Sequence, residues 1–124
     1  MVEPFLMRRE GDALVNDLTA DAVITSMQIA QGLGASSAYT WLKLPVVDEM
    51  ERVMDATTLP TLLLGGDPAG EPAETYAQWE AALALPSVRG LMVGRSLLYP
   101  ADDDVDHAVD VAAGLVRAAG KERR

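Results

Sequence analysis

The sequence predicts an α/β fold built from four consecutive strand–helix units with parallel strands. Short apolar runs alternate with amphipathic stretches along the 124 residues, which is the pattern of parallel βα units. The connections are of ordinary length, and no low-complexity segment interrupts them. Two architectures fit this pattern. One is an open four-stranded sheet with helices on both faces, and the other is four units of an eight-unit TIM barrel, which needs about 250 residues.

The start of the chain favours the barrel over the open sheet. Met1 and Val2 are the only lead-in to the first expected strand, whereas a native domain rarely begins so abruptly. The expected fold is therefore a single domain, residues 1–124, that forms a truncated (βα)4 half of a TIM (β/α)8 barrel.

Four short apolar segments are expected to be strands. They are residues 2–7, 39–47, 60–66 and 88–94. The third is so apolar that it fits only a strand buried on both sides. Parallel strands of this kind place ligands at their carboxyl ends.

Four amphipathic stretches are expected to be the helices. Thr19 is a plausible N-cap for the first helix, Gly34 its stop, and Asp48 the cap of the second. Apolar stripes mark the third and fourth helices: Tyr76, Trp79 and Leu83, then Val105, Ala108, Val109, Ala112 and Leu115.

Composition excludes several classes of function. A net charge of −9 argues against a nucleic-acid partner, because phosphate backbones are held by clustered Lys and Arg. No apolar run approaches the about 20 residues that cross a bilayer. With no cysteine and a single histidine, His107, neither a metal site nor a Ser-His-Asp site is expected. The absence of cysteine and of a signal-peptide pattern predicts a cytoplasmic location.

Lys43 is the most informative residue, because it interrupts the apolar stretch 41–47. Desolvation disfavours an ammonium and favours the neutral amine, which is a nucleophile able to form a Schiff base with a carbonyl. Glu3, which is expected at the same end of the sheet as Lys43, is the candidate acid/base group. The alternative is that Lys43 reaches solvent or pairs with a carboxylate such as Glu3 without any chemistry.

A phosphate site is the second expected feature of the strand ends. Gly65, Gly66, Gly94 and Arg95 follow the third and fourth expected strands. Glycine lets a backbone N–H approach an oxyanion closely, and arginine adds a bidentate donor. The alternative is simple turn chemistry after a strand.

Four pieces of the sequence together resemble a known family. They are Val2-Glu3-Pro4, residues 42–46, residues 64–66 and residues 90–95. In this order they are similar to the C-terminal half of class I aldolases of the DeoC/LacD group, which are deoxyribose-phosphate and tagatose-bisphosphate aldolase-like proteins.

The resemblance implies that Lys43 is the Schiff-base lysine and Glu3 the neighbouring carboxylate. It further implies that Gly65, Gly66, Gly94 and Arg95 hold the substrate phosphate. The implied activity is a metal-independent carbon–carbon lyase, with no cofactor, acting on a small phosphorylated ketose or sugar acid.

Half a barrel exposes sheet edges, so the chain is expected to form a homo-oligomer or to pair with a missing N-terminal half. Its activity alone is in doubt on this interpretation. Two other hypotheses remain open. One is a non-catalytic (βα)4 module that binds a phosphorylated ligand or a partner chain, and the other is a flavodoxin-like regulatory domain, which the positions of Glu3 and Lys43 fit poorly.

Overall fold

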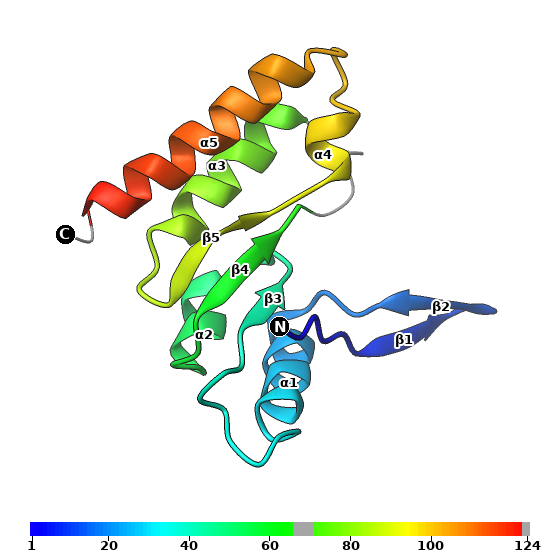
Figure 1. Cartoon of the computed structure of the whole chain (residues 1–124). Coiled ribbons are helices and arrows are strands. Elements are labelled where there is room, and N and C mark those ends of the chain that lie inside the picture. Colours follow the sequence, from blue (N-terminus) through cyan, green and yellow to red (C-terminus); the bar gives the residue numbers. More distant parts are fainter. Residues whose placement is uncertain (66–70, 123–124) are drawn as a thin grey trace.

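The computed structural model describes residues 1–65 and 71–122 and contains two kinds of sheet (Figure 1). β1 (Met7–Glu10) and β2 (Ala13–Asn16) form an antiparallel hairpin. A parallel sheet has the order β3 (Leu42–Leu44), β4 (Thr61–Leu64), β5 (Val88–Met92). The helices are α1 (Ala20–Gln31), α2 (Met50–Asp55), α3 (Pro72–Leu83), α4 (Arg95–Leu98) and α5 (Val105–Glu122).

The predicted (βα)4 half of a TIM barrel is wrong. The chain is a small α/β structure with one two-stranded antiparallel sheet and one three-stranded parallel sheet. The first expected strand is reduced to an isolated parallel bridge between Val2 and Leu42. Val2 donates to the Trp41 carbonyl at 2.8 Å, but Pro4 has no N–H with which to continue the ladder.

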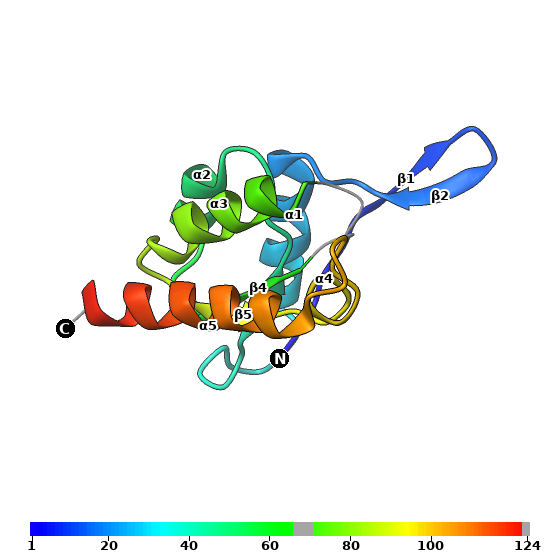
Figure 2. The same ribbon diagram turned by 90° about the horizontal axis from the view of Figure 1, so that it is seen from above.

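The hairpin takes the place of that strand and of the loop expected after it. Glu10 pairs with Ala13 across a two-residue loop of Gly11 and Asp12. Gly11 has φ +62°, a left-handed conformation that glycine adopts without steric cost. In Figures 1 and 2 the hairpin projects away from the rest of the chain.

The start of α1 follows the prediction. Thr19 is the N-cap, and its hydroxyl accepts a hydrogen bond from the Ala22 N–H at 3.3 Å. Asp17 fixes this cap in turn, since its Oδ1 accepts from the Thr19 N–H at 3.0 Å and from the Thr19 hydroxyl at 2.9 Å. The other two predicted helix boundaries are wrong. The helix α1 ends at Gln31 with Gly32 as its C-cap, and Glu49, with φ 61°, is the N-cap of α2.

The Asp17 cap predicts a pH dependence at the start of α1. Hydrogen bonds from the Thr19 backbone and side chain lower the pKa of Asp17 from its ordinary value of 3.8. A lowered pKa means that the ionised carboxylate stabilises the folded state above pH 3.8, and that this contribution is lost as the pH falls through the lower, folded pKa. The protection factor of the Ala22 amide, which donates to the Thr19 hydroxyl, should therefore fall at acid pH.

Asp17→Asn should remove that acid-side change in exchange, whereas Asp12→Asn in the hairpin loop should leave it intact. An unchanged exchange profile in Asp17→Asn would contradict this reading of the cap.

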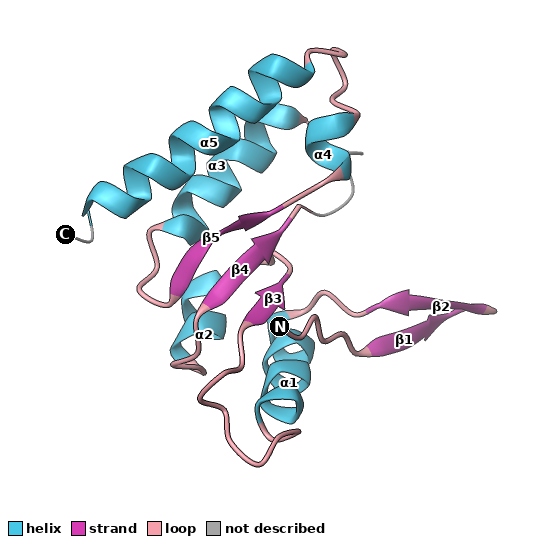
Figure 3. Cartoon of the chain, viewed as in Figure 1, coloured by secondary structure: helices cyan, strands magenta, loops and turns pink. Residues whose placement is uncertain are grey.

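The core lies on one face of the parallel sheet. Leu42, Leu44 and Leu63 are fully buried there, and the register pairs Leu44 with Leu63 across β3 and β4. Figure 2 shows α1, α2 and α3 together on one side, while α5 packs against α3 and β5. The strand–helix alternation from β3 to β5 is clear in Figure 3. Among the described residues, no helix combines the length and apolar character that a membrane span requires.

Candidate functional site

Lys43 and Glu3 form an ion pair on the face of the sheet opposite the core. The Lys43 Nζ lies 2.9 Å from the Glu3 Oε2. The Lys43 side chain is 19% exposed and that of Glu3 41% exposed. The Lys43 side chain as a whole is thus mostly buried, while its carboxylate partner stays in contact with solvent.

The local sequence explains this arrangement. Side chains alternate between the faces of a strand, so the burial of Leu42 and Leu44 in the core sends Lys43 to the other face. The bridge at Val2 sets the register of the first residues, because the Lys43 N–H donates to the Val2 carbonyl at 2.9 Å. Glu3 follows Val2 and therefore lies beside Lys43.

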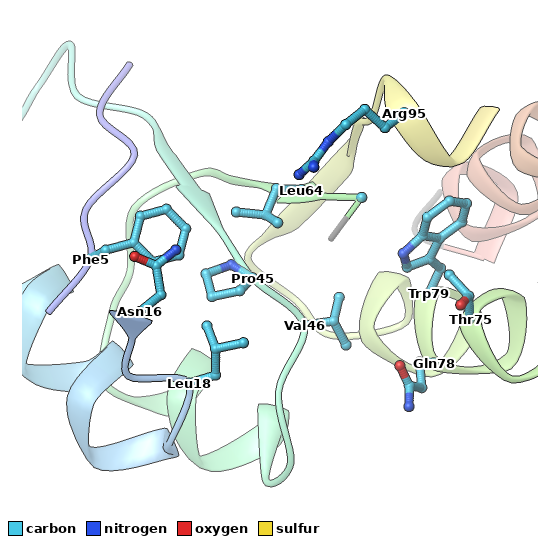
Figure 4. Close-up of a pocket in the computed structure, with 11 residues that line it drawn as sticks. Phe5, Asn16, Leu18, Pro45, Val46, Leu64, Thr75, Gln78, Trp79 and Arg95 are labelled. Carbon is cyan, nitrogen blue, oxygen red and sulfur yellow. The ribbon is translucent and has the colours of Figure 1, made fainter. Parts of the chain in front are cut away.

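A cavity of about 400 Å³ lies at the carboxyl ends of β3 and β4, as Figure 4 shows. Residues from the N-terminal segment, the hairpin, α3 and α4 surround it. Its lining consists of Phe5, Asn16, Leu18, Pro45, Val46, Leu64, Gly65, Thr75, Gln78, Trp79 and Arg95.

The cavity adjoins the Lys43–Glu3 pair without including it. Phe5 lies two residues beyond Glu3, and Pro45 lies two residues beyond Lys43. In extended backbone, residues two apart point to the same face. The cavity is therefore the continuation of the ion-paired face toward the strand ends.

Arg95 brings a positive charge to the cavity. In Figure 4 its guanidinium extends over Leu64 toward the cavity. Phe5 and Asn16 lie on one side of it and Trp79 on the other. Gly65 lines the same space at the end of β4. Arg95 and Gly65, two of the residues predicted to hold a phosphate, thus line the same cavity, and the phosphate site itself stays a prediction.

Close packing also requires a glycine at position 65. A Cβ at this position would lie 2.9 Å from the Ser96 Oγ and 2.9 Å from the Val93 Cβ. Ser96 also donates a hydrogen bond to the Gly65 carbonyl at 3.0 Å. The glycine lets the end of β4 pack directly against the residues that follow β5.

Gly65→Ala should therefore lower the free energy of unfolding by about 1–3 kcal/mol, the usual cost of forcing an extra carbon into a packed site. Gly94→Ala is the matched control, because no atom lies within 4 Å of a Cβ there and Gly94 does not have positive φ. Urea unfolding followed by circular dichroism measures both. Equal losses in the two variants would contradict the packing role of Gly65.

The remaining predicted residues lie elsewhere. Gly94 precedes the four-residue helix α4 and does not line the cavity. Gly66 falls outside the described residues. His107 is exposed near the start of α5, where its N–H donates to the Asp104 Oδ1 at 2.9 Å. In the described part of the chain, no group of three or more His, Asp or Glu residues is arranged to hold a metal ion.

Several cavity residues were not predicted from the sequence. Asn16 reaches the cavity from the hairpin, and Thr75 and Gln78 reach it from α3. The two-residue Gly11-Asp12 loop between short alternating runs was the available signal for the hairpin. No local signal marks Thr75 or Gln78, since only the packing of α3 brings them to the strand ends.

Comparisons with known proteins identify relatives of this chain. The model of the Cgl0159-like family matches residues 1–113. A crystal structure of Cgl0159 from Corynebacterium glutamicum, a structural genomics target, is 62% identical with a TM-score of 0.88. The match covers 94% of this chain and 39% of that one, so this chain spans well under half of its relative. No curated protein matches.

These matches overturn the resemblance stated from the sequence. The family that matches is Cgl0159-like, and no aldolase family does, so the assignment to the DeoC/LacD group, as its C-terminal half, is wrong. The quoted motifs were short pieces dominated by glycine, proline and apolar residues. Such pieces recur at the strand ends of many parallel α/β proteins, since turns there need the same residue types.

Proposed function

This chain belongs to the Cgl0159-like family, and we propose that it carries the Schiff-base centre of a carbon–carbon lyase acting on a phosphorylated ketose or sugar acid. The observation that carries the proposal is the Lys43–Glu3 pair, with 2.9 Å between Nζ and Oε2 and a Lys43 side chain that is 19% exposed. The proposal rests on this site and not on the family. A cytoplasmic location is part of it, supported by the absence of cysteine.

Glu3 serves as the proton acceptor that frees the Lys43 amine. The amine then attacks the substrate carbonyl, and the resulting carbinolamine loses water to give an iminium. Glu3 can return its proton to the departing hydroxyl, so the charge on the pair is restored within the same site. The iminium accepts the electron pair of the breaking carbon–carbon bond while a base removes the proton of the adjacent hydroxyl group.

Arg95 and Gly65 support the choice of a phosphorylated substrate. Both line the cavity that continues the ion-paired face, and a guanidinium binds phosphate through two parallel hydrogen bonds. Asn16, Thr75 and Gln78 add polar groups for the hydroxyls of a sugar chain. A substrate phosphate held near Arg95 would leave its carbonyl end directed toward Lys43.

Reduction of the iminium tests this proposal. The protein is incubated with dihydroxyacetone phosphate, reduced with sodium borohydride, and mapped by peptide mass spectrometry. Only two lysines are present, Lys43 and the exposed Lys121 in α5, so Lys121 is an internal control. The proposal predicts an adduct on Lys43 that forms more slowly with unphosphorylated dihydroxyacetone. Equal labelling of both lysines, or none, would overturn it.

A second candidate function is supported by the ion pair itself. Lys43 already has a carboxylate partner, which is what a purely structural lysine also needs when it leaves water. In that case the cavity would belong to a non-catalytic module that binds a phosphorylated ligand. Isothermal titration with dihydroxyacetone phosphate separates the two functions: binding that depends on Arg95, without a trapped adduct, favours the module.

A further inference from the structure

The parallel sheet has one well-covered face and one that is only half covered. Leu42, Leu44 and Leu63 are 0% exposed on the core face. On the other face, Leu62 and Leu64 are half-buried and Met92 is 42% exposed. Parallel sheets occur almost only with both faces buried, so the second face lacks part of its usual cover.

An apolar groove continues this face beyond β5. It has a volume of about 540 Å³ and runs between the end of β5 and helix α5. Met92 and Val109 line it and are 42% and 43% exposed. Arg117 is the single charged residue among those that line it. A groove of this character fits an apolar polypeptide segment better than a polar small molecule.

The solved relative offers a candidate to cover this face. Its matched region has the same fold, with a TM-score of 0.88 at 62% identity, yet that region is only 39% of its chain. The relative's chain therefore contains a large amount of polypeptide in addition to the same fold. A half-covered parallel sheet is the surface to which additional polypeptide would add burial.

We propose that the half-covered face, defined by Leu62, Leu64, Met92 and the groove residue Val109, binds a polypeptide equivalent to the part of the Corynebacterium glutamicum relative outside the matched region. Binding covers the second face and closes the site around Lys43 from the open side. This inference does not depend on the proposed lyase reaction, because it concerns the apolar surface alone.

Co-expression tests the inference. The complete chain, carrying an affinity tag, is produced together with the unmatched part of the relative, and complexes are measured by size-exclusion chromatography with light scattering. A 1:1 complex is expected. Met92→Glu should weaken it at least tenfold, because it places a charge in the apolar contact. Ile29→Glu, at a 57% exposed position on α1, is the matched control and should bind as the wild type does.

Cysteine labelling provides a second measurement. The chain contains no cysteine, so Met92→Cys gives a single thiol whose alkylation rate should fall in the complex. Absence of a complex, a co-expressed polypeptide that stays insoluble, or equal losses in both glutamate variants would overturn the inference. So would self-association of the chain that Met92→Glu abolishes, since a second copy would then be the occupant.

Discussion

Replacing Glu3 by Gln should slow iminium formation at Lys43 by about 10²–10⁴-fold, the usual effect of removing a positioned acid/base group. Gln keeps the shape of the side chain but cannot accept the ammonium proton over the 2.9 Å contact. The amine would then depend on water for deprotonation, and the carbinolamine would lose its nearby proton donor. Rapid-quench borohydride trapping with dihydroxyacetone phosphate gives the rate directly.

The control for this prediction is Glu10→Gln. Glu10 also pairs with a cation, since its Oε1 lies 3.7 Å from the Arg8 Nη2, but that pair is on the exposed hairpin. The control should trap substrate at the wild-type rate. If Glu3→Gln and Glu10→Gln behave alike, Glu3 takes no part in the chemistry and the pair is structural.

Trp79→Ala should lower the free energy of unfolding by about 3–5 kcal/mol, the range for removing a buried aromatic side chain. Trp79 is 2% exposed on α3, and its ring centroid lies 5.7 Å from that of Tyr76. The substitution removes the contacts that the Trp79 ring makes and opens one wall of the cavity. Urea unfolding followed by far-ultraviolet circular dichroism measures the loss.

Tyr39→Ala is the matched aromatic control. Tyr39 is 94% exposed, so its truncation should change the free energy of unfolding by less than about 0.5 kcal/mol. A cost of Trp79→Ala no larger than that of Tyr39→Ala would show that α3 is not anchored through this side chain.

Sequence patterns predicted the part of the fold that depends on local periodicity. From residue 42 onward, apolar runs became β3, β4 and β5, and the stripe containing Trp79 became α3. The prediction for the N-terminal segment was wrong because an apolar pattern does not show which strand a segment pairs with. Pro4 cannot supply the next ladder donor, and Gly11 permits a tight hairpin, so the chain leaves the sheet after Val2.

The candidate site was predictable only in part. The apolar stretch around Lys43 singled this residue out, and pairing with Glu3 was one of the two interpretations open from the sequence. A contact with Glu3 is expected whether Lys43 has a catalytic or a structural role, so the contact does not distinguish the two roles. The cavity is lined by residues from six separate stretches of the chain, and sequence spacing carries no information about how such stretches come together in space.

The most direct measurement of the central claim is hydrogen exchange in the substrate itself. An adduct can form at any reactive amine, but exchange at carbon that depends on Lys43 needs its iminium to lie beside a positioned base. In D₂O, the proposed site should exchange the hydrogen on the hydroxymethyl carbon next to the carbonyl of dihydroxyacetone phosphate, as followed by proton NMR. Lys43→Arg, which preserves the charge beside Glu3, should reduce exchange to the buffer rate. Exchange at the same rate in Lys43→Arg and the wild type, or none in the wild type, would contradict the assignment of Lys43.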